Sequence, residues 1–457
     1  MKQVKAKTLK ATVIDNNFCS GCGVCTATKG SPFKMNLTKN GNFEPIVIDK
    51  ELLDNNVVCP FGDHEHDETK IADEKFKNKK NISFDTQVGY YNKIYAGHVN
   101  KGSYRQKGSS GGSVSWLCNE LLEKKIVDFV VHVKVSESKD LMYQYNISSN
   151  KEEVHNGAKS RYYPVSLEGV LEKIKEIEGK YLVVGVPCFI KGINLIRKQE
   201  TVFQQRILLT AAIFCGHLKT THYLESIINQ FSLDKSEVES FDFRHKIEGR
   251  VASDYGTKIS TKTGGEYTKL NTEIFGTNWG LGMFKLKACD YCDDVIGETA
   301  DISFGDAWLP KYIDDYLGTN VIVTRNKIVD DLIGEAISSG DIVYEFLTPE
   351  ELYESQAGGY RHRREGLKHR LAVAKVKKQW VPKKRVSPIK EANKNRRKIY
   401  ENRMQLQQKS FHSVNYAKID LLKKELSSLI ETNQKLNKLT LLKRILLKIK
   451  REFKKTK

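Results

Sequence analysis

Four cysteines near the start of the chain constrain its fold more than any other feature. Cys19, Cys22 and Cys25 are separated by two residues each, and Cys59 follows at a distance with Pro60 directly after it. Three thiolates from one tight loop and a fourth from afar suit a 4Fe–4S cluster, in which each iron needs one ligand. Zinc accepts the same ligands but more often takes them as two Cys-x-x-Cys pairs, so the spacing favours iron–sulfur.

This arrangement resembles a bacterial-type ferredoxin, in which the motif occurs twice and each fourth cysteine serves the other cluster. Here the fourth position of the first motif is Lys29, and the first three positions of the second motif are Asp49, Leu52 and Asn55. All four ligands of one cluster are present and all four of the other are missing. We therefore expect residues 1–75 to form a ferredoxin-like module with one complete 4Fe–4S cluster.

A second quartet can be assembled from the remaining cysteines. Cys188 and Cys215 each follow a predicted buried strand, so neighbouring strands would bring them to one edge of a sheet, and Cys289 and Cys292 form a close pair. Cys118 lies on the apolar face of a predicted helix and is interpreted as a core residue. Core positions for Cys188 and Cys215 stay open as an alternative. In a reducing compartment, metal ligation explains nine cysteines better than disulfides do.

Strand-like and helical segments alternate after the polar stretch at residues 67–81, which we interpret as a linker. The predicted strands are 94–99, 126–135, 180–188 and 206–216, and the predicted helices are 113–125, 170–179 and 189–199. This order predicts an α/β core over residues 85–350, with a mixed sheet and flanking helices. The ferredoxin-like module precedes the core, and a basic helical tail over residues 361–457 follows it.

Several blocks of the core identify a family. KGSSGGSVSWL, GAKSRYYP, LVVGVPCFIKGINLI, FCGH, FDFRHKIEGR and ACDYC with ADISFGDAWLP follow in the order found in the beta subunit of coenzyme F420-reducing hydrogenases and dehydrogenases. That family also includes plant hydroxymethyl-chlorophyll a reductase. The resemblance implies a non-covalent FAD beside 4Fe–4S clusters, and it supports a second cluster on Cys188, Cys215, Cys289 and Cys292. Family resemblance fixes the cofactor class better than the acceptor, so F420 itself is not assigned as substrate.

Two loops and two single residues form the predicted flavin site. Glycines and hydroxyls that open a helix offer amides and the positive helix end to a phosphate, and a second loop offers two cations beside an aromatic ring. An ordinary N-cap and a solvated turn are the alternatives. Hydride transfer needs no side-chain nucleophile, so no catalytic acid or base is assigned. The predicted flavin ligands are Lys107, Ser109, Ser110, Gly111, Gly112, Lys159 and Arg161, with Arg244 and Asp306 added through the resemblance alone.

The positive charge of the chain is concentrated in its tail. Residues 361–457 hold 31 Lys and Arg against 7 Asp and Glu, while the whole chain has a net charge of +19, so the part before the tail is mildly acidic. A leucine stripe at Leu422, Leu426, Leu429 and Leu436 suits a homo-oligomer or a partner subunit. A final basic amphipathic segment, with Leu442, Leu446, Ile449 and Phe453 on one face, suits an anionic membrane surface. Nucleic-acid binding is disfavoured because the tail has few aromatic residues and no binding motif.

Together these features predict an iron–sulfur flavoprotein oxidoreductase. Electrons would pass between a one-electron donor such as ferredoxin and a two-electron acceptor, a small molecule or a lipid-linked substrate such as one of surface-polysaccharide biosynthesis. No apolar stretch is long enough to span a bilayer and the N-terminus lacks an apolar signal region, so a cytoplasmic location is expected, with peripheral attachment at the inner face of the membrane through the tail. The alternative is a non-catalytic, cysteine-rich zinc-binding scaffold that acts at a membrane or on nucleic acid.

Overall fold

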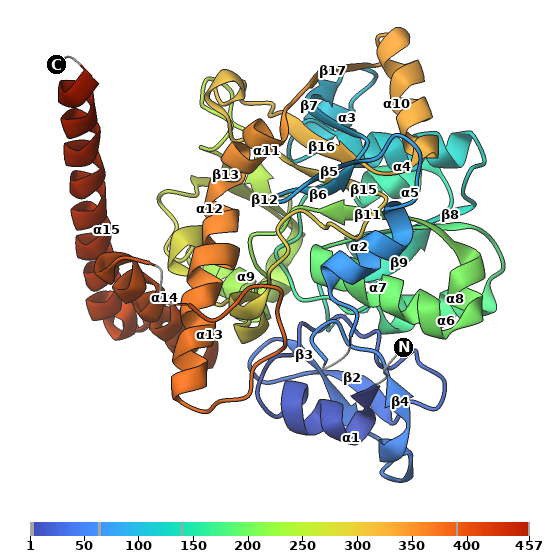
Figure 1. The fold of residues 1–457 in the computed structure, drawn as a ribbon, viewed down its shortest axis with the longest axis horizontal. Helices are drawn as coiled ribbons and strands as arrows, with labels where there is room; N and C mark the ends of the chain where they lie inside the picture. The colour runs from blue at the N-terminus through green and yellow to red at the C-terminus, as the bar shows by residue number, and fades with distance from the viewer. Residues whose placement is uncertain (1–3, 63–64, 139, 390–391, 456–457) are drawn as a thin grey trace.

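A mixed eight-stranded sheet forms the centre of the molecule (Figure 1). The computed structural model describes residues 4–62, 65–138, 140–389 and 392–455, with side chains described up to residue 438. Neighbours among β8, β10, β11 and β15 run parallel, and the outer pairs run antiparallel. In sheet order the strands are β17 (Ile342–Phe346), β7 (Lys93–Val99), β16 (Asn320–Thr324), β15 (Ile302–Asp306), β11 (Ile207–Ile213), β10 (Tyr181–Gly185), β8 (Phe129–Val135) and β9 (Tyr143–Ser148).

Helices cover both faces of this sheet, which confirms the predicted α/β class. Along β10, Tyr181 and Val183 pack in one apolar cluster with α6 and α7, whereas Leu182 and Val184 pack in another with α4 and α10. Both faces of a parallel strand are therefore buried, which explains the continuous apolar run of its sequence. The helices of these two layers are α3 (Tyr104–Lys107), α4 (Ser113–Glu123), α5 (Lys151–Asn156), α6 (Glu168–Glu176), α7 (Pro187–Gln199), α8 (Thr201–Arg206) and α10 (Lys327–Ser338).

The N-terminal segment lies at one end of the core, in blue in Figure 1. Its strands β1 (Val4–Lys5) and β4 (Asn56–Val57) pair with each other, as do β2 (Phe33–Leu37) and β3 (Phe43–Val47). A short helix, α1 (Ala6–Leu9), continues as a π-helical turn over Lys10–Ile14, and a 3-10 turn spans Glu51–Asp54. The boundaries predicted for the three domains stay predictions.

The prediction of a linker at residues 67–81 is wrong in its first half. Helix α2 (Glu68–Phe76) occupies this stretch, and Asp67 caps it by accepting a hydrogen bond from the amide of Lys70 at 2.9 Å. Ile71 and Phe76 are fully buried. The many charged residues hide a helical spacing of apolar positions that is sufficient to dock the helix on the core. The hairpin of β5 (Ser83–Asp85) and β6 (Gly89–Tyr91) follows.

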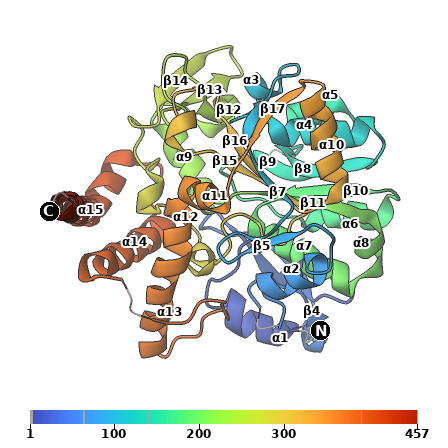
Figure 2. The ribbon, with the colours of Figure 1, turned by 45° about the horizontal axis from the view of Figure 1, so that its top comes forward.

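A second, three-stranded antiparallel sheet lies beside the core (Figure 2). It consists of β12 (Val238–His245), β13 (Gly256–Thr261) and β14 (Glu266–Leu270), and it packs with α9 (Thr221–Asn229) in one apolar cluster. Short 3-10 turns span Lys235–Glu237, Trp279–Leu281, Lys287–Tyr291 and Pro310–Tyr312.

The C-terminal region packs on the body before it leaves as a long helix, in red in Figure 1. The stripe expected to bind another subunit is used within the chain. Leu422 and Leu426 are fully buried in the cluster that contains α9, and the side-chain amide of Asn433 donates to the side-chain carbonyl of Asn402 at 2.7 Å. Side chains of the predicted membrane-binding face lie outside the described residues. The helices here are α11 (Pro349–Ser355), α12 (Ala357–Arg361), a π-helical turn His362–Gly366, α13 (Leu367–Val376), α14 (Lys394–His412) and α15 (Ile419–Lys455).

Within the part of the chain that the structure describes, no helix is both long and apolar enough to cross a membrane.

Candidate functional site

The first cysteine quartet is held by a loop and by the segment after β4. Gly21 and Gly23 in the loop have φ of +76° and +80°, and a Cβ on Gly23 would come within 2.3 Å of the Ser166 hydroxyl, so this tight path requires glycine. The amide of Gly21 donates to the Cys19 sulfur at 3.3 Å. Backbone amides that point at sulfur are the surroundings expected for a cluster-binding loop.

The four thiols of this quartet lie within electrostatic reach of one another. Burial raises the pKa of Cys19, and the charges of Cys22 and Cys59 raise it further. Burial also raises the pKa of Cys25, again with contributions from Cys22, Cys19 and Cys59. Four thiolates gathered in a buried site repel each other, and a cationic metal core bound between them would remove that repulsion.

The second quartet is assembled from three segments of the core. Cys188 lies in the first turn of α7, Cys215 follows β11, and Cys289 and Cys292 lie in and directly after the 3-10 turn Lys287–Tyr291. Burial raises the pKa of Cys188, and the charges of Cys292, Cys215 and Cys289 add to it in that order. The structure thus brings together the four cysteines proposed as second-cluster ligands, and it leaves Cys118 in the apolar core.

The two quartets adjoin each other. The charge of Cys22 acts on Cys188, and both act on the buried Tyr145 hydroxyl. Cys25, Cys59, Cys188 and Cys292 also share one apolar cluster, although they are far apart in sequence. Two redox centres at these positions would be neighbours.

The thiols of each quartet lie near one another without forming a site for a single metal ion. Within the described residues, no three His, Cys, Asp or Glu side chains lie close enough to hold a single metal ion. A tetrahedral zinc ion would hold its thiolates about 4 Å apart. A 4Fe–4S cluster spreads them more widely because irons and sulfides stand between them, which is compatible with thiols that interact electrostatically without touching.

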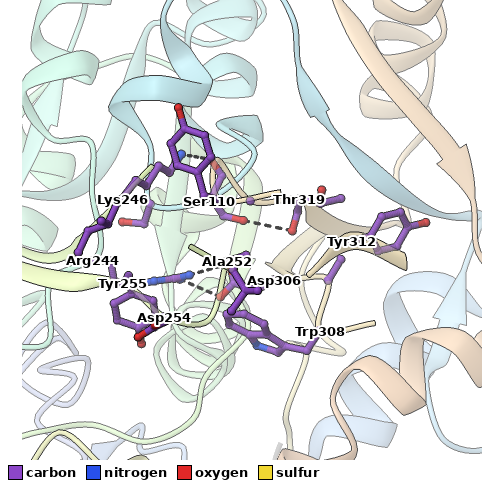
Figure 3. Close-up of a pocket in the computed structure, with 16 residues that line it drawn as sticks. Ser110, Arg244, Lys246, Ala252, Asp254, Tyr255, Asp306, Trp308, Tyr312 and Thr319 are labelled. Carbon is purple, nitrogen blue, oxygen red and sulfur yellow. Dashed lines mark hydrogen bonds and ion pairs between the residues drawn. The ribbon is translucent and has the colours of Figure 1, made fainter. Parts of the chain in front are cut away.

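A polar cleft lies where β12, β15 and the loop before α4 meet (Figure 3). Arg244 forms two hydrogen bonds to the Asp306 carboxylate at 2.8 and 3.3 Å, and its guanidinium lies 4.8 Å from the Tyr255 ring. The Ser110 hydroxyl donates to the Thr319 carbonyl at 3.1 Å. Pairing with Asp306 leaves the buried Nε of Arg244 without a hydrogen-bond partner in the described structure.

Lys246 extends across this cleft. Its ammonium donates to the carbonyl of Ser110 at 2.9 Å and to the carbonyl of Arg105. Burial lowers the pKa of Lys246 to about 7, and the nearby charges of Lys159, Arg105 and Arg244 contribute. Each of these neighbouring cations is itself paired with a carboxylate: Lys159 with Asp242, Arg105 with Asp315 and Arg244 with Asp306. An anion bound beside Lys246 would favour its charged form.

Four of the nine predicted flavin ligands line the cleft, namely Ser109, Ser110, Arg244 and Asp306. The others lie outside its lining. Gly112 has φ of +85° and begins α4, where a Cβ would come within 2.6 Å of the Tyr104 carbonyl oxygen, and Gly111 packs equally closely on neighbouring backbone. Lys107 is exposed, Lys159 pairs with Asp242 at 2.8 Å, and Arg161 donates to the carbonyls of Phe241 and Ala158.

The cleft is also lined by residues that were not predicted from the sequence, among them Lys246, Tyr255, Trp308 and Thr319. Lys246 belongs to the FDFRHKIEGR block from which Arg244 was chosen, so a cation two residues after Arg244, on the same side of an extended strand, was the available signal. The aromatic rings gave no comparable signal, because aromatic residues are common in cores.

Aromatic side chains connect the cleft to the second quartet. Trp279 packs over Gly216, where an added Cβ would come within 3.3 Å of its ring. The Trp279 ring lies 4.7 Å from that of Tyr162, and Tyr162 neighbours Arg244 and Tyr255 at the cleft. A continuous series of contacts therefore runs from the residue after Cys215 to the cleft.

Comparison with known proteins identifies the family. Residues 94–172 match the N-terminal part, and residues 178–350 match the C-terminal part, of the coenzyme F420 hydrogenase/dehydrogenase beta subunit. The chain belongs to the coenzyme F420 hydrogenase/dehydrogenase beta subunit family.

Three individual proteins show how far the similarity extends. An uncharacterized protein of Methanocaldococcus jannaschii is 24% identical over 74% of this chain and 92% of its own length. The coenzyme F420-dependent sulfite reductase of the same organism is 23% identical over 69% of this chain, but the match spans only 45% of the reductase. A chain of the F420-reducing NiFe hydrogenase complex of Methanosarcina barkeri is similar with a TM-score of 0.49 and 16% identity, over 64% of this chain and 96% of that one.

Proposed function

We propose that this protein is an iron–sulfur flavoprotein oxidoreductase that transfers electrons between a one-electron donor such as ferredoxin and a two-electron acceptor. The observation that carries this proposal is the adjoining pair of thiol quartets, with the second quartet joined by aromatic contacts to a polar cleft. Membership of a family named for redox enzymes supports it. A zinc-binding scaffold would have no use for the aromatic contacts between cysteines and cleft.

In this proposal the two quartets hold two 4Fe–4S clusters and the cleft holds FAD. Bound there, FAD would supply the exchange between one-electron and two-electron steps. Arg244, Lys246 and the Ser109 and Ser110 hydroxyls are donors suited to its phosphates. The cleft is narrow, with an open volume of about 10 Å³, so a flavin would enter only if Lys246 released the Ser110 carbonyl and the aromatic walls moved apart.

The side chains have distinct roles in this scheme. Arg244, fixed by Asp306, orients the bound anion, and Lys246 supplies a second positive charge. Trp308 and Tyr255 exclude water from the cleft and pack against Arg244. The proton that accompanies a two-electron reduction comes from solvent in this proposal, because no general acid is assigned.

The acceptor and the cellular setting are also proposals. The relatives named for F420 make F420 one candidate, and a small-molecule or lipid-linked substrate of polysaccharide biosynthesis is another. A partner subunit is proposed because one similar protein is a chain of a hydrogenase complex. Attachment to an anionic membrane from the cytoplasmic side is assigned to the last turns of α15.

The test of this function is an anaerobic electron-transfer assay. Protein purified without oxygen should contain about eight irons per chain and, after FAD is added, should bleach the flavin when reduced ferredoxin is supplied. Reoxidation is then followed with F420 and with other candidate acceptors. Purified protein that contains zinc without iron would contradict the proposal.

A pH titration tests the part assigned to Lys246. The ammonium loses its charge as the pH rises through about 7, whereas the phosphates of FAD stay ionised. We therefore expect FAD affinity to fall by up to about tenfold between about pH 6 and pH 8. Lys246→Met should bind FAD more weakly and with little pH dependence, while the exposed Lys262→Met should behave as wild type. An equal pH dependence in both variants would contradict this role.

A further inference from the structure

The region that follows the matched family segment supplies a buried cation to the second quartet. Arg363 lies in the π-helical turn His362–Gly366, beyond residue 350 where the family match ends. Only 1% of its surface is exposed. Its guanidinium donates to the carbonyls of Cys215 and Gly216 at 2.6 and 2.9 Å, so it lies directly on the loop that carries one proposed ligand.

This guanidinium interacts with thiolates and not with a carboxylate. Burial alone would lower the pKa of Arg363, but the charges of Cys292 and Cys215, a hydrogen bond to Cys292 and the charge of Cys289 raise it above its ordinary value. Within the described residues, its Nε has no hydrogen-bond partner and it forms no ion pair with an Asp or Glu. Its positive charge is therefore directed at the quartet, where the Asp294 carboxylate acts on Cys215 with the opposite sign.

Two other cations near the second quartet face the Asp290 carboxylate, and a third, Lys219, acts on Cys289 while it donates to the Met283 carbonyl. Lys285 pairs with Asp290 at 2.6 Å, and Arg370 donates to the Asp290 backbone carbonyl while its charge faces the same carboxylate. Near the first quartet, the carboxylate of Glu44 acts on Cys19 and the ammonium of Lys191 acts on Cys59, so charges of both signs are present. Arg363 is thus a guanidinium, charged at any physiological pH, that lies on the loop carrying Cys215 without an ion pair to a carboxylate among the described residues.

We propose that Arg363 raises the reduction potential of the second cluster above that of the first, so that electrons move from the first quartet toward the cleft. This inference rests on the proposed function. A cluster that accepts one electron from a one-electron donor becomes more negative by one charge, with no bond made or broken. A buried positive charge beside the ligand loop stabilises the reduced form of the cluster. Net charge and hydrogen bonding are recognised determinants of the reduction potential of a cluster.

The test is an anaerobic redox titration followed by electron paramagnetic resonance. The signal lost in Cys215→Ser identifies the second cluster. In Arg363→Met, at a fixed applied potential, the ratio of reduced to oxidised second cluster should fall at least tenfold, which is 59 mV for a one-electron couple. Arg363→Lys retains the charge and should shift less. The exposed Arg361→Met, two residues away, should shift neither cluster.

Each result decides the question. An unchanged second-cluster potential in Arg363→Met, or an equal shift of both clusters, overturns the role of Arg363 while leaving the proposed function intact. Absence of iron from the wild type overturns both. If Arg363→Met loses its second cluster, the reduction potential of that cluster is compared between Arg363→Lys and Arg363→Gln. A lower potential in Arg363→Gln than in Arg363→Lys supports the charge effect, and equal potentials overturn it.

Discussion

Replacing Cys188 by serine is expected to lower the iron content of the anaerobically purified protein from about eight to about four atoms per chain. Cys188 is the member of the second quartet on which the other three thiolates all act, and it also borders the first quartet through Cys22. Removing one of four thiolate ligands should leave a cluster too labile to survive purification. Iron and sulfide analysis with visible absorption would measure the loss.

Two further variants make this result specific. Cys22→Ser should remove the other half of the iron, because Cys22 belongs to the first quartet. Cys118→Ser should keep all of it, since Cys118 lies in the apolar core between α4 and the sheet, away from both quartets. Full iron in Cys188→Ser, or loss of iron in Cys118→Ser, would contradict the assignment of ligands. Stoichiometric zinc in place of iron would favour the scaffold alternative.

Apolar runs and helical periodicity in the sequence were sufficient to predict individual strands and helices of the core. The strand at β10 and the helix at α7 follow from an apolar run and from helical periodicity after Pro187, a residue suited to the first turn. The convergence of Cys188 and Cys215 followed from the rule that parallel strands end at one edge of a sheet. The family blocks supplied the position of Arg244 and Asp306, whose pairing no spacing rule would give.

Tertiary contacts decided what the sequence alone could not predict. The leucine stripe of α15 has the same spacing whether it faces another chain or this one, and only the position of α9 and α14 shows that it is internal. The same limit applies to charge. Arg363 and Arg385 both belong to the basic tail by sequence position. In the structure Arg363 is buried and Arg385 is mostly buried, with 12% of its side chain exposed, and both lie beside the proposed second-cluster loop. Net charge by segment does not separate buried cations from solvated ones.

Arg385→Met is expected to destabilise the protein by about 3–5 kcal/mol at neutral pH, because it leaves buried carboxylates without their partner. Arg385 forms a bidentate contact with Glu298 at 2.7 and 2.9 Å, and its backbone amide donates to Asp293 at 3.1 Å. Its neighbour Lys384 lies 4.7 Å from the Phe61 ring and pairs with Asp293 at 3.6 Å. The segment between α13 and α14 therefore ties the N-terminal segment to the second-quartet loop.

The loss of stability in Arg385→Met should depend on pH in a defined direction. Burial opposes ionisation of Asp293, but Lys384 and Arg385 hold its pKa below the usual range, so their stabilisation is present at neutral pH and is lost as the pH falls through that lowered pKa. Without Arg385 the carboxylates should take up protons at a higher pH, which relieves the unpaired charge. We therefore expect the free-energy difference between wild type and Arg385→Met to be largest near pH 7 and smaller near pH 5.

Urea unfolding at both pH values, with iron content measured alongside, would test this prediction. The exposed Lys383→Met, two residues earlier, removes the same formal charge and should change the free energy of unfolding by less than about 0.5 kcal/mol. Adding Glu298→Gln to Arg385→Met should recover part of the loss, because it removes the carboxylate left unpaired. Equal costs in Arg385→Met and Lys383→Met would show that the buried ion pairs do not hold this segment. A loss of stability in Arg385→Met that grew toward pH 5 would show that unpaired carboxylates are not its cause.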